Sequence, residues 1–127
     1  MQRTKSKNPA LICTFGQIKL ASLVLLDKLK EQVDSIYYSG DFDPEGLLIA
    51  DRLKERYRDK LELWRFGVEN YEQIKSDKTI EATRMKKLDN INTPEIKSLA
   101  NRLKADGYAA YQELLTERYV EDILALL

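Results

Sequence analysis

The chain has 127 residues, the length of one ordinary domain with one hydrophobic core. Apolar residues make up 43% and charged residues 33%, which excludes the disordered and fibrous classes. A membrane-spanning helix needs about 20 consecutive apolar residues, and the sequence has no such run, so we expect no membrane partner. The basic start is not followed by the apolar stretch of a secretory signal. Lysine plus arginine and aspartate plus glutamate number 21 each, so net charge neither favours nor excludes nucleic acid.

Cysteine and histidine usage narrows the possible chemistry. The single cysteine, Cys13, excludes an internal disulfide and favours a cytoplasmic location. Because Cys13 lies in an apolar run, we expect a small buried residue and not a nucleophile. The absence of histidine excludes ordinary zinc sites and the nucleophile systems that depend on histidine. What remains is the chemistry of carboxylates, lysines, tyrosines, hydroxyls and hard metal ions bound by oxygen.

The first half of the chain alternates between predicted strands and helices after a polar, basic leader at 1–9. The segments are, in order, a strand at 10–15, a helix at 18–32, a strand at 35–39, a helix at 47–57 and a strand at 61–66. Such alternation is typical of a parallel sheet whose strands are joined by right-handed helical crossovers.

The second half is predicted to be mostly helical. The polar segment 71–87 is expected to be helical in part. Thr93 as cap and Pro94 at the first helical position begin a helix that ends near Ala105. A last helix at 108–126 carries an apolar stripe, which we expect to pack on the sheet or on a neighbour.

Three carboxylates fall within the short turn between the strand at 35–39 and the helix at 47–57. Ligands bind at the carboxyl ends of parallel strands, and Asp41 and Asp43, two residues apart in extended chain, can point the same way. Two neighbouring carboxylates repel unless a cation neutralises them. Oxygen ligands without histidine favour Mg²⁺ or Mn²⁺. We therefore predict Asp41 and Asp43 as metal ligands, and Glu45 as a third ligand or a residue behind them.

Other interpretations of this turn were compared. Asp, Pro and Gly also form ordinary turns, and acids at a helix N-terminus complement the helix dipole. An EF-hand is excluded because the twelfth loop position is Arg52 and not glutamate. A phosphate-binding P-loop is excluded because the GxxxxGK[ST] motif is absent. A receiver domain would need an acidic pair after its first strand and a phospho-acceptor aspartate two strands later, which this chain does not show.

The order strand, GDFDPEGLLIA, helix resembles the DxD motif of Toprim domains, the metal-binding α/β modules of topoisomerases, bacterial primases and several nucleases. The DxDPxG form is most similar to that of type IIB topoisomerase A subunits. The wider pattern CTFGQIKLASLVLLDKL, YYSGDFDPEGLLIADRLKERY and LELWRF resembles the C-terminal Toprim domain of the nuclease subunit of Wadjet-type plasmid-defence systems, which act with a condensin-like ATPase. The resemblance is close over 10–66 and loose over the tail.

The resemblance implies an α/β fold, a Toprim-like parallel sheet with flanking helices that lacks its first strand and carries a helical C-terminal tail. Toprim domains hold a catalytic glutamate at the end of that first strand, and no residue here matches it. Either Phe15 takes that place in an inactive copy, or, as the better alignment has it, Thr14-Phe15-Gly16 matches the turn after the second strand. The domain is then divided into a leader at 1–9, the Toprim core from its second strand onward at 10–67, and a helical part at 68–127.

The function implied by the resemblance is that of a fragment of a Mg²⁺-dependent (or Mn²⁺-dependent) DNA nuclease that acts against plasmids. Asp41 and Asp43 would be its catalytic residues, double-stranded DNA its substrate, and a condensin-like ATPase its partner, with a homodimer as a further option. The alternative is a non-catalytic Toprim-like interaction module that mediates dimer or partner contacts. Without the first strand, 10–15 and 35–39 would either pair directly or leave a gap for a strand of another chain.

Some other residues can be placed from their spacing. Trp64 and Phe66, at strand spacing, are expected in the core and not to stack on bases. Tyr37 and Tyr38 should face opposite sides of a strand, and Asp51 should lie at the surface or behind the site. Basic residues of the second half are expected on solvated helix faces and not on phosphates: Arg84, Lys86, Lys87, Arg102 and Lys104.

Overall fold

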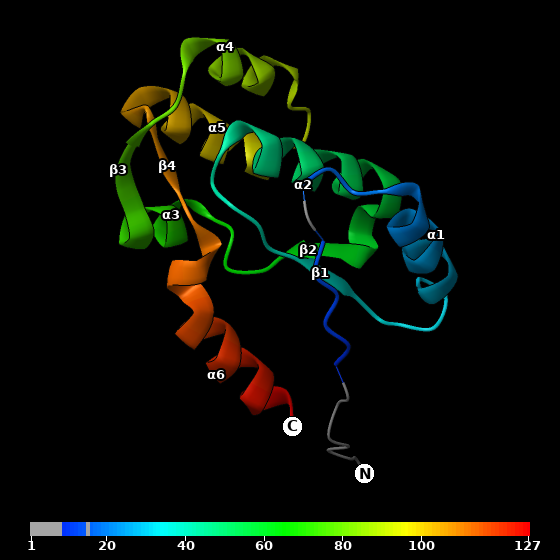
Figure 1. Cartoon of the computed structure of the whole chain (residues 1–127). Helices are drawn as coiled ribbons and strands as arrows, with labels where there is room; N and C mark the ends of the chain where they lie inside the picture. Colours follow the sequence, from blue (N-terminus) through cyan, green and yellow to red (C-terminus); the bar gives the residue numbers. More distant parts are fainter. Residues whose placement is uncertain (1–8, 15) are drawn as a thin grey trace.

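The structure is a computed structural model that describes residues 9–14 and 16–127 (Figure 1). Its helices and strands mix along the chain, as the sequence predicts for an α/β fold. The helices are α1 (Leu20–Leu29), α2 (Pro44–Tyr57), α3 (Val68–Ile74), α4 (Ala82–Met85), α5 (Pro94–Asp106) and α6 (Thr116–Leu126). The strands are β1 (Ile36–Tyr38), β2 (Leu61–Leu63), β3 (Lys75–Thr79) and β4 (Tyr108–Ala110), and the short 3-10 turns are η1 (Arg58–Lys60), η2 (Lys86–Asn90) and η3 (Gln112–Leu115).

The predicted parallel sheet is confirmed in β1 and β2. The two strands pair in parallel with Ile36 opposite Leu61 and Tyr38 opposite Leu63, and α2 is the crossover between them. Tyr37 is exposed and Tyr38 half-buried, as expected for neighbours in a strand. The carboxyl end of β1 leads directly to the N-terminus of α2, which places the acidic turn at the edge where parallel sheets bind ligands.

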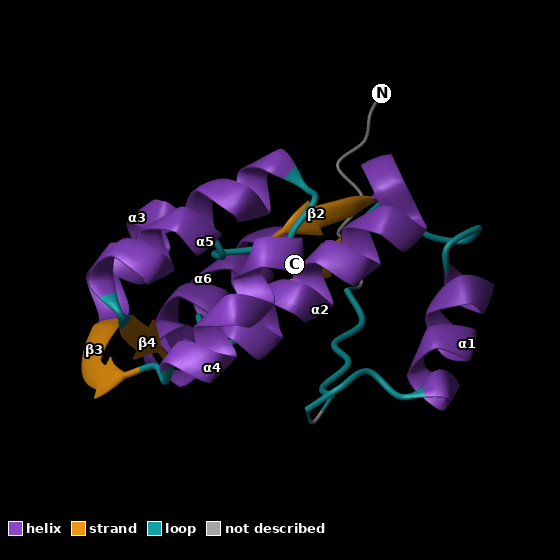
Figure 2. Cartoon of the chain, turned by 90° about the horizontal axis from the view of Figure 1, so that it is seen from above, coloured by secondary structure: helices purple, strands orange, loops and turns teal. Residues whose placement is uncertain are grey.

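A second, antiparallel sheet is formed by β3 and β4. Both strands lie in segments, 71–87 and 108–126, that the sequence predicted to be partly or wholly helical. Gly107 adopts the left-handed conformation and ends α5, so Tyr108 begins a strand and the last helix starts only at Thr116. A left-handed glycine is a common helix stop, whereas the extended backbone after it is fixed by pairing with a segment far away in sequence. In Figures 1 and 2 this sheet lies at the opposite end of the molecule from α1.

The main core unites both halves of the chain. Phe42 and Phe66 stack with ring centres 4.7 Å apart, and Tyr71 lies 5.7 Å from Phe42. Helix α5 adds the buried side chains of Ile96, Leu99 and Leu103. The expected core position of Phe66 is confirmed. Trp64 is only half-buried: it packs on Tyr119 and donates to Asp122 at 2.7 Å, so it fixes α6 to the end of β2.

The N-terminal run was predicted to be a buried strand, and this is wrong for its described part. Residues 10–14 form no strand and are exposed, including Cys13, while Phe15 lies outside the described residues. Among residues 9–14 and 16–127, β1 pairs with β2 alone, and the run does not join this sheet. Apolar composition alone does not supply a packing partner. Neither direct pairing of 10–14 with β1 nor a central strand beside it is found.

Asp51 was expected at the surface or behind the site, but it is a buried structural residue. Only 3% of its surface is exposed. Its carboxylate accepts hydrogen bonds from the backbone N–H of Asn92 and of Thr93, the latter at 2.8 Å. Thr93 and Pro94 begin α5 as predicted. The side chain of Thr93 makes no capping bond, and the carboxylate of Asp51 instead holds the backbone just before the helix and places a negative charge near its N-terminus.

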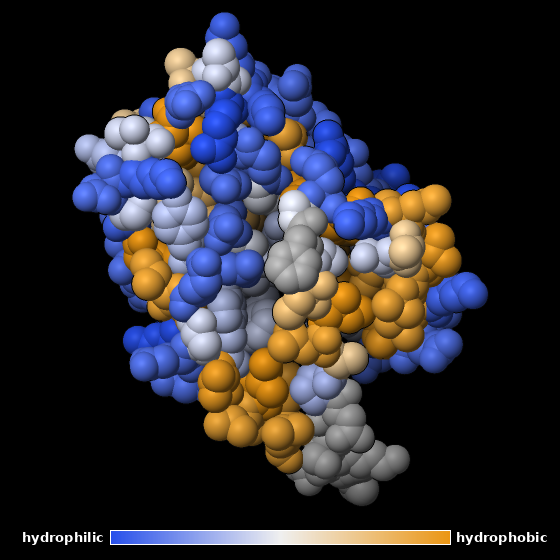
Figure 3. Space-filling view, viewed as in Figure 1, coloured by the Kyte–Doolittle hydropathy of each residue, from blue (hydrophilic) through white to orange (hydrophobic). Residues whose placement is uncertain are grey.

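Apolar side chains remain exposed on α1 and near the end of α6, where they gather on the face shown in Figure 3. Leu20 and Leu124 are 76% and 62% exposed. Within the part of the chain that the structure describes, no helix is long and apolar enough to cross a membrane.

Candidate metal site at the acidic turn

Phe42 sets the orientation of the acidic turn. Its side chain is fully buried, and its backbone forms a bridge to Ala110, with N–H donated in both directions at 2.8 and 3.1 Å. Side chains alternate in extended chain, so the half-buried carboxylates of Asp41 and Asp43 project to the side opposite Phe42. The C-terminal strand β4 therefore helps to build the site, which local sequence patterns did not indicate.

Asp43 caps helix α2. Its Oδ1 accepts a hydrogen bond from the Gly46 N–H at 2.7 Å, and Pro44 follows at the first helical position. Burial raises the pKa of this carboxyl, and the nearby charges of Glu45 and Asp41 raise it further, against lowering contributions from Gly46 and Arg84. An acid whose charge is disfavoured by burial and by like charges is one that a bound cation would relieve.

Asp41 is held from the C-terminal side of the chain. Its Oδ1 accepts a hydrogen bond from the backbone N–H of Gln112 at 2.9 Å, at the start of η3. Close by, the hydroxyl groups of Ser39 and Tyr119 lie 2.5 Å apart. Burial raises the pKa of Tyr119, and the charge of Asp41 contributes in the same direction. Gln112 and Tyr119 thus belong to the surroundings of the site, and only the three-dimensional pairing of β4 reveals them.

Glu45 is engaged by two basic residues from the segment that contains α4 and η2. Arg84 donates to both carboxylate oxygens, Nε to Oε1 at 3.0 Å and Nη2 to Oε2 at 2.8 Å, and Lys87 Nζ lies 3.3 Å from Oε1. These contacts lower the pKa of Glu45 to about 2. Arg84 and Lys87 remain partly exposed, as expected for solvated helix faces, but they also contact the acidic turn, which the sequence did not predict. Arg84 and Lys87 lie about forty positions after Glu45, so local sequence patterns do not indicate this pairing.

The donor set suits a hard cation at two carboxylates. Asp41 and Asp43 each use Oδ1 for a backbone N–H, and the Oδ2 of Asp43 lies 3.6 Å from Arg84. Among the described residues, no group of three or more acidic, cysteine or histidine side chains is arranged to hold a metal ion. Mg²⁺ is commonly held by one or two carboxylates together with water and phosphate oxygens. Asp41 and Asp43 are the two carboxylates of the turn that could serve in this way, whereas Glu45 is engaged by Arg84.

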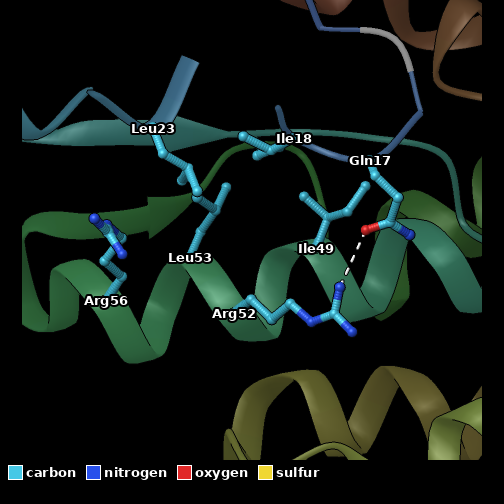
Figure 4. Close-up of a pocket in the computed structure, with 7 residues that line it drawn as sticks. All are labelled: Gln17, Ile18, Leu23, Ile49, Arg52, Leu53 and Arg56. Atoms are coloured by element: carbon cyan, nitrogen blue, oxygen red, sulfur yellow. Dashed lines mark hydrogen bonds between the residues drawn. The ribbon is translucent and has the colours of Figure 1, made fainter. Parts of the chain in front are cut away.

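The acidic turn does not lie in the small cavity between α2 and the segment that leads into α1. That cavity, of about 250 Å³, is lined by Gln17, Ile18, Leu23, Ile49, Arg52, Leu53 and Arg56 (Figure 4). Arg52 donates to Gln17 across it at 3.0 Å. None of the three turn carboxylates lines this cavity, so a ligand of the turn would bind elsewhere.

Comparison with protein families gave one result that covers nearly the whole chain. The family described as "Protein of unknown function C-terminus (DUF2399)" matches residues 1–123. The chain belongs to the DUF2399 family. Neither the curated proteins nor the solved structures gave a match. The part shared with DUF2399 includes the acidic turn, Arg84 with Lys87, and Tyr119.

Proposed function

We propose that this DUF2399 chain is the metal-binding part of a Toprim-type DNA nuclease that acts in the cytoplasm against plasmids. Double-stranded DNA is its substrate and a condensin-like ATPase its partner in this proposal. The observation that carries it is the placement of Asp41 and Asp43 on one side of the turn at the carboxyl end of β1, in a strand-helix-strand unit. The resemblance of the GDFDPEG segment to the Toprim DxD motif supports the same conclusion.

In this proposal Asp41 and Asp43 hold one Mg²⁺ or Mn²⁺ ion through the oxygens that do not accept a backbone N–H. When bound, such an ion stabilises charge at a phosphodiester and supplies a hydroxide nucleophile near neutral pH. The residues of this chain hold the carboxylates in place, since Gln112 and Gly46 each donate a backbone N–H to one of them. No residue here matches the Toprim glutamate, so metal binding, and not DNA cleavage, is the appropriate readout for this chain alone.

Titration with Mn²⁺ by calorimetry tests the proposal. We expect one ion to bind, and Asp41→Asn and Asp43→Asn each to weaken binding at least about tenfold, because a lost carboxylate ligand removes charge next to the ion. Asparagine also caps helices well, so Asp43→Asn keeps the start of α2 intact. The raised pKa of Asp43 predicts that binding weakens as the pH falls, since protons compete for this oxygen.

The matched control is Asp77→Asn, which removes the same charge from an exposed position in β3. It should bind Mn²⁺ as the wild type does. Equal affinities of the wild type, Asp41→Asn and Asp43→Asn would show that the turn holds no metal.

A second candidate is a non-catalytic interaction module that mediates dimer or partner contacts. The exposed apolar side chains of Leu11, Leu20 and Leu124 favour it, because such groups are commonly covered by a partner. Site-specific Mn²⁺ binding supports the nuclease proposal, and its absence leaves the interaction module as the better account.

A further inference from the structure

Arg84 holds a fixed position beside the acidic turn. Its guanidinium donates to both oxygens of Glu45, and Nη2 also lies 3.6 Å from Oδ2 of Asp43. The Arg84 side chain remains 37% exposed and that of Lys87 49%. The η2 part of the segment that carries them contacts α2, and α4 lies above α2 in Figure 1. A solvent-accessible, oriented cation therefore adjoins the predicted metal ligands.

We propose that Arg84, assisted by Lys87, binds a backbone phosphate of DNA next to the metal ion; this inference rests on the proposed function. A guanidinium has five N–H donors in a planar fork that matches phosphate oxygens. Glu45 accepts from Nε and from Nη2, so the two N–H groups of Nη1 and one of Nη2 remain for an anion. Glu45 thus orients the fork without using all of it.

The charge balance explains why this contact would depend on metal. Asp41, Asp43 and Glu45 carry three negative charges, and Arg84 and Lys87 carry two positive ones. Without a divalent ion the cluster is net negative by one charge and repels phosphate. With the ion bound it becomes net positive by one charge and attracts phosphate.

The same geometry predicts that loss of Arg84 changes the affinity for Mn²⁺ and the affinity for DNA in opposite directions. The positive charge of Arg84 near Asp43 disfavours a second cation, so Arg84→Gln should tighten Mn²⁺ binding. Loss of the fork should weaken DNA binding in saturating Mn²⁺. Glu45→Gln removes the negative charge but keeps a side-chain oxygen that can still accept from Arg84, so the fork stays in place. It should therefore weaken Mn²⁺ binding and leave DNA binding in saturating Mn²⁺ unchanged or tighter. If the pair only fixed α4 to α2, both substitutions would act alike.

The experiment measures Mn²⁺ by calorimetry and a fluorescein-labelled DNA duplex by anisotropy, in Mn²⁺ at fixed salt, with each variant checked for folding by circular dichroism. For Arg84→Gln we expect Mn²⁺ affinity to rise roughly fivefold and DNA affinity to fall about tenfold. Arg84→Lys keeps the charge without the fork and should recover part of the DNA affinity. Lys86→Gln is the matched control, because Lys86 is exposed and makes no ion pair with any residue that the structure describes.

Either of two results would overturn the phosphate-binding role of Arg84 while leaving the proposed metal site standing. One is a DNA affinity of Arg84→Gln equal to that of Lys86→Gln, and the other is parallel losses in Arg84→Gln and Glu45→Gln. Failure of the wild type to bind Mn²⁺ would instead refute the proposed function, and the inference with it.

Discussion

Asp51→Ala is expected to lower the free energy of unfolding by about 2–3 kcal/mol, because it removes the buried acceptor of two part-buried backbone hydrogen bonds. The carboxylate is buried and accepts from the N–H groups of Asn92 and Thr93, which precede α5. It also places a negative charge at that helix N-terminus. Since single domains are stable by only about 5–15 kcal/mol, this is a large loss. Urea unfolding followed by circular dichroism measures it.

Asp59→Ala serves as the control for Asp51→Ala. Asp59 is an exposed residue of η1, and no side-chain hydrogen bond or ion pair links it to the residues that the structure describes. Its replacement should change stability by less than about 0.5 kcal/mol. If the Asp51 and Asp59 variants unfold at the same urea concentration, the carboxylate does not hold α5 to α2.

Gly46→Ala is expected to disrupt the acidic turn, with a loss of about 2–4 kcal/mol in unfolding free energy. A Cβ at this position would lie 2.1 Å from the backbone carbonyl oxygen of Asp41, which cannot rotate away. Relief of that overlap must move the backbone between Asp41 and Asp43. The same movement would break the hydrogen bond from Tyr38 to the Gly46 carbonyl and the Asp43 cap. We therefore expect Mn²⁺ affinity to fall together with stability.

The matched control for Gly46→Ala is Gly67→Ala. The nearest atom to a Cβ at Gly67 is the carboxylate end of Glu69 at 3.2 Å, which is flexible. Gly67 is the N-cap of α3 and Gly46 lies in the first turn of α2, so both changes add one methyl group near a helix start. Gly67→Ala should cost less than about 1 kcal/mol. Comparable losses in both variants would mean that the close approach to Asp41 does not constrain the turn.

The sequence permitted prediction of the parts of the fold that local patterns determine. The alternation of apolar runs with an amphipathic helix predicted β1, α2 and β2 as a parallel unit, and the spacing of Asp41 and Asp43 predicted their common side. Phe42 explains the latter, because one buried residue between two acids orients both. Thr93 and Pro94 marked the start of α5 through backbone preferences that act within one turn.

The errors came from contacts between distant segments. β3 and β4 exist because they pair with each other, and Phe42 meets Ala110 across 68 positions of sequence. The buried position of Asp51 and the pairing of Arg84 with Glu45 arise in the same way. Residues 10–14 are the reverse case: they are an apolar run that makes no pairing with another segment and is exposed, so composition alone did not predict their structure.

Paramagnetic broadening by Mn²⁺ in amide NMR spectra tests most directly whether the acidic turn holds a metal ion. Signal loss falls steeply with distance from the ion, so the amides that vanish first locate it. The proposed site predicts early loss at Asp43, Gly46 and Gln112, with Gln17 and Ile18 of the separate cavity affected last, and no selective loss in Asp43→Asn. Uniform broadening, or early loss at Gln17 and Ile18 instead, would contradict a metal site at this turn.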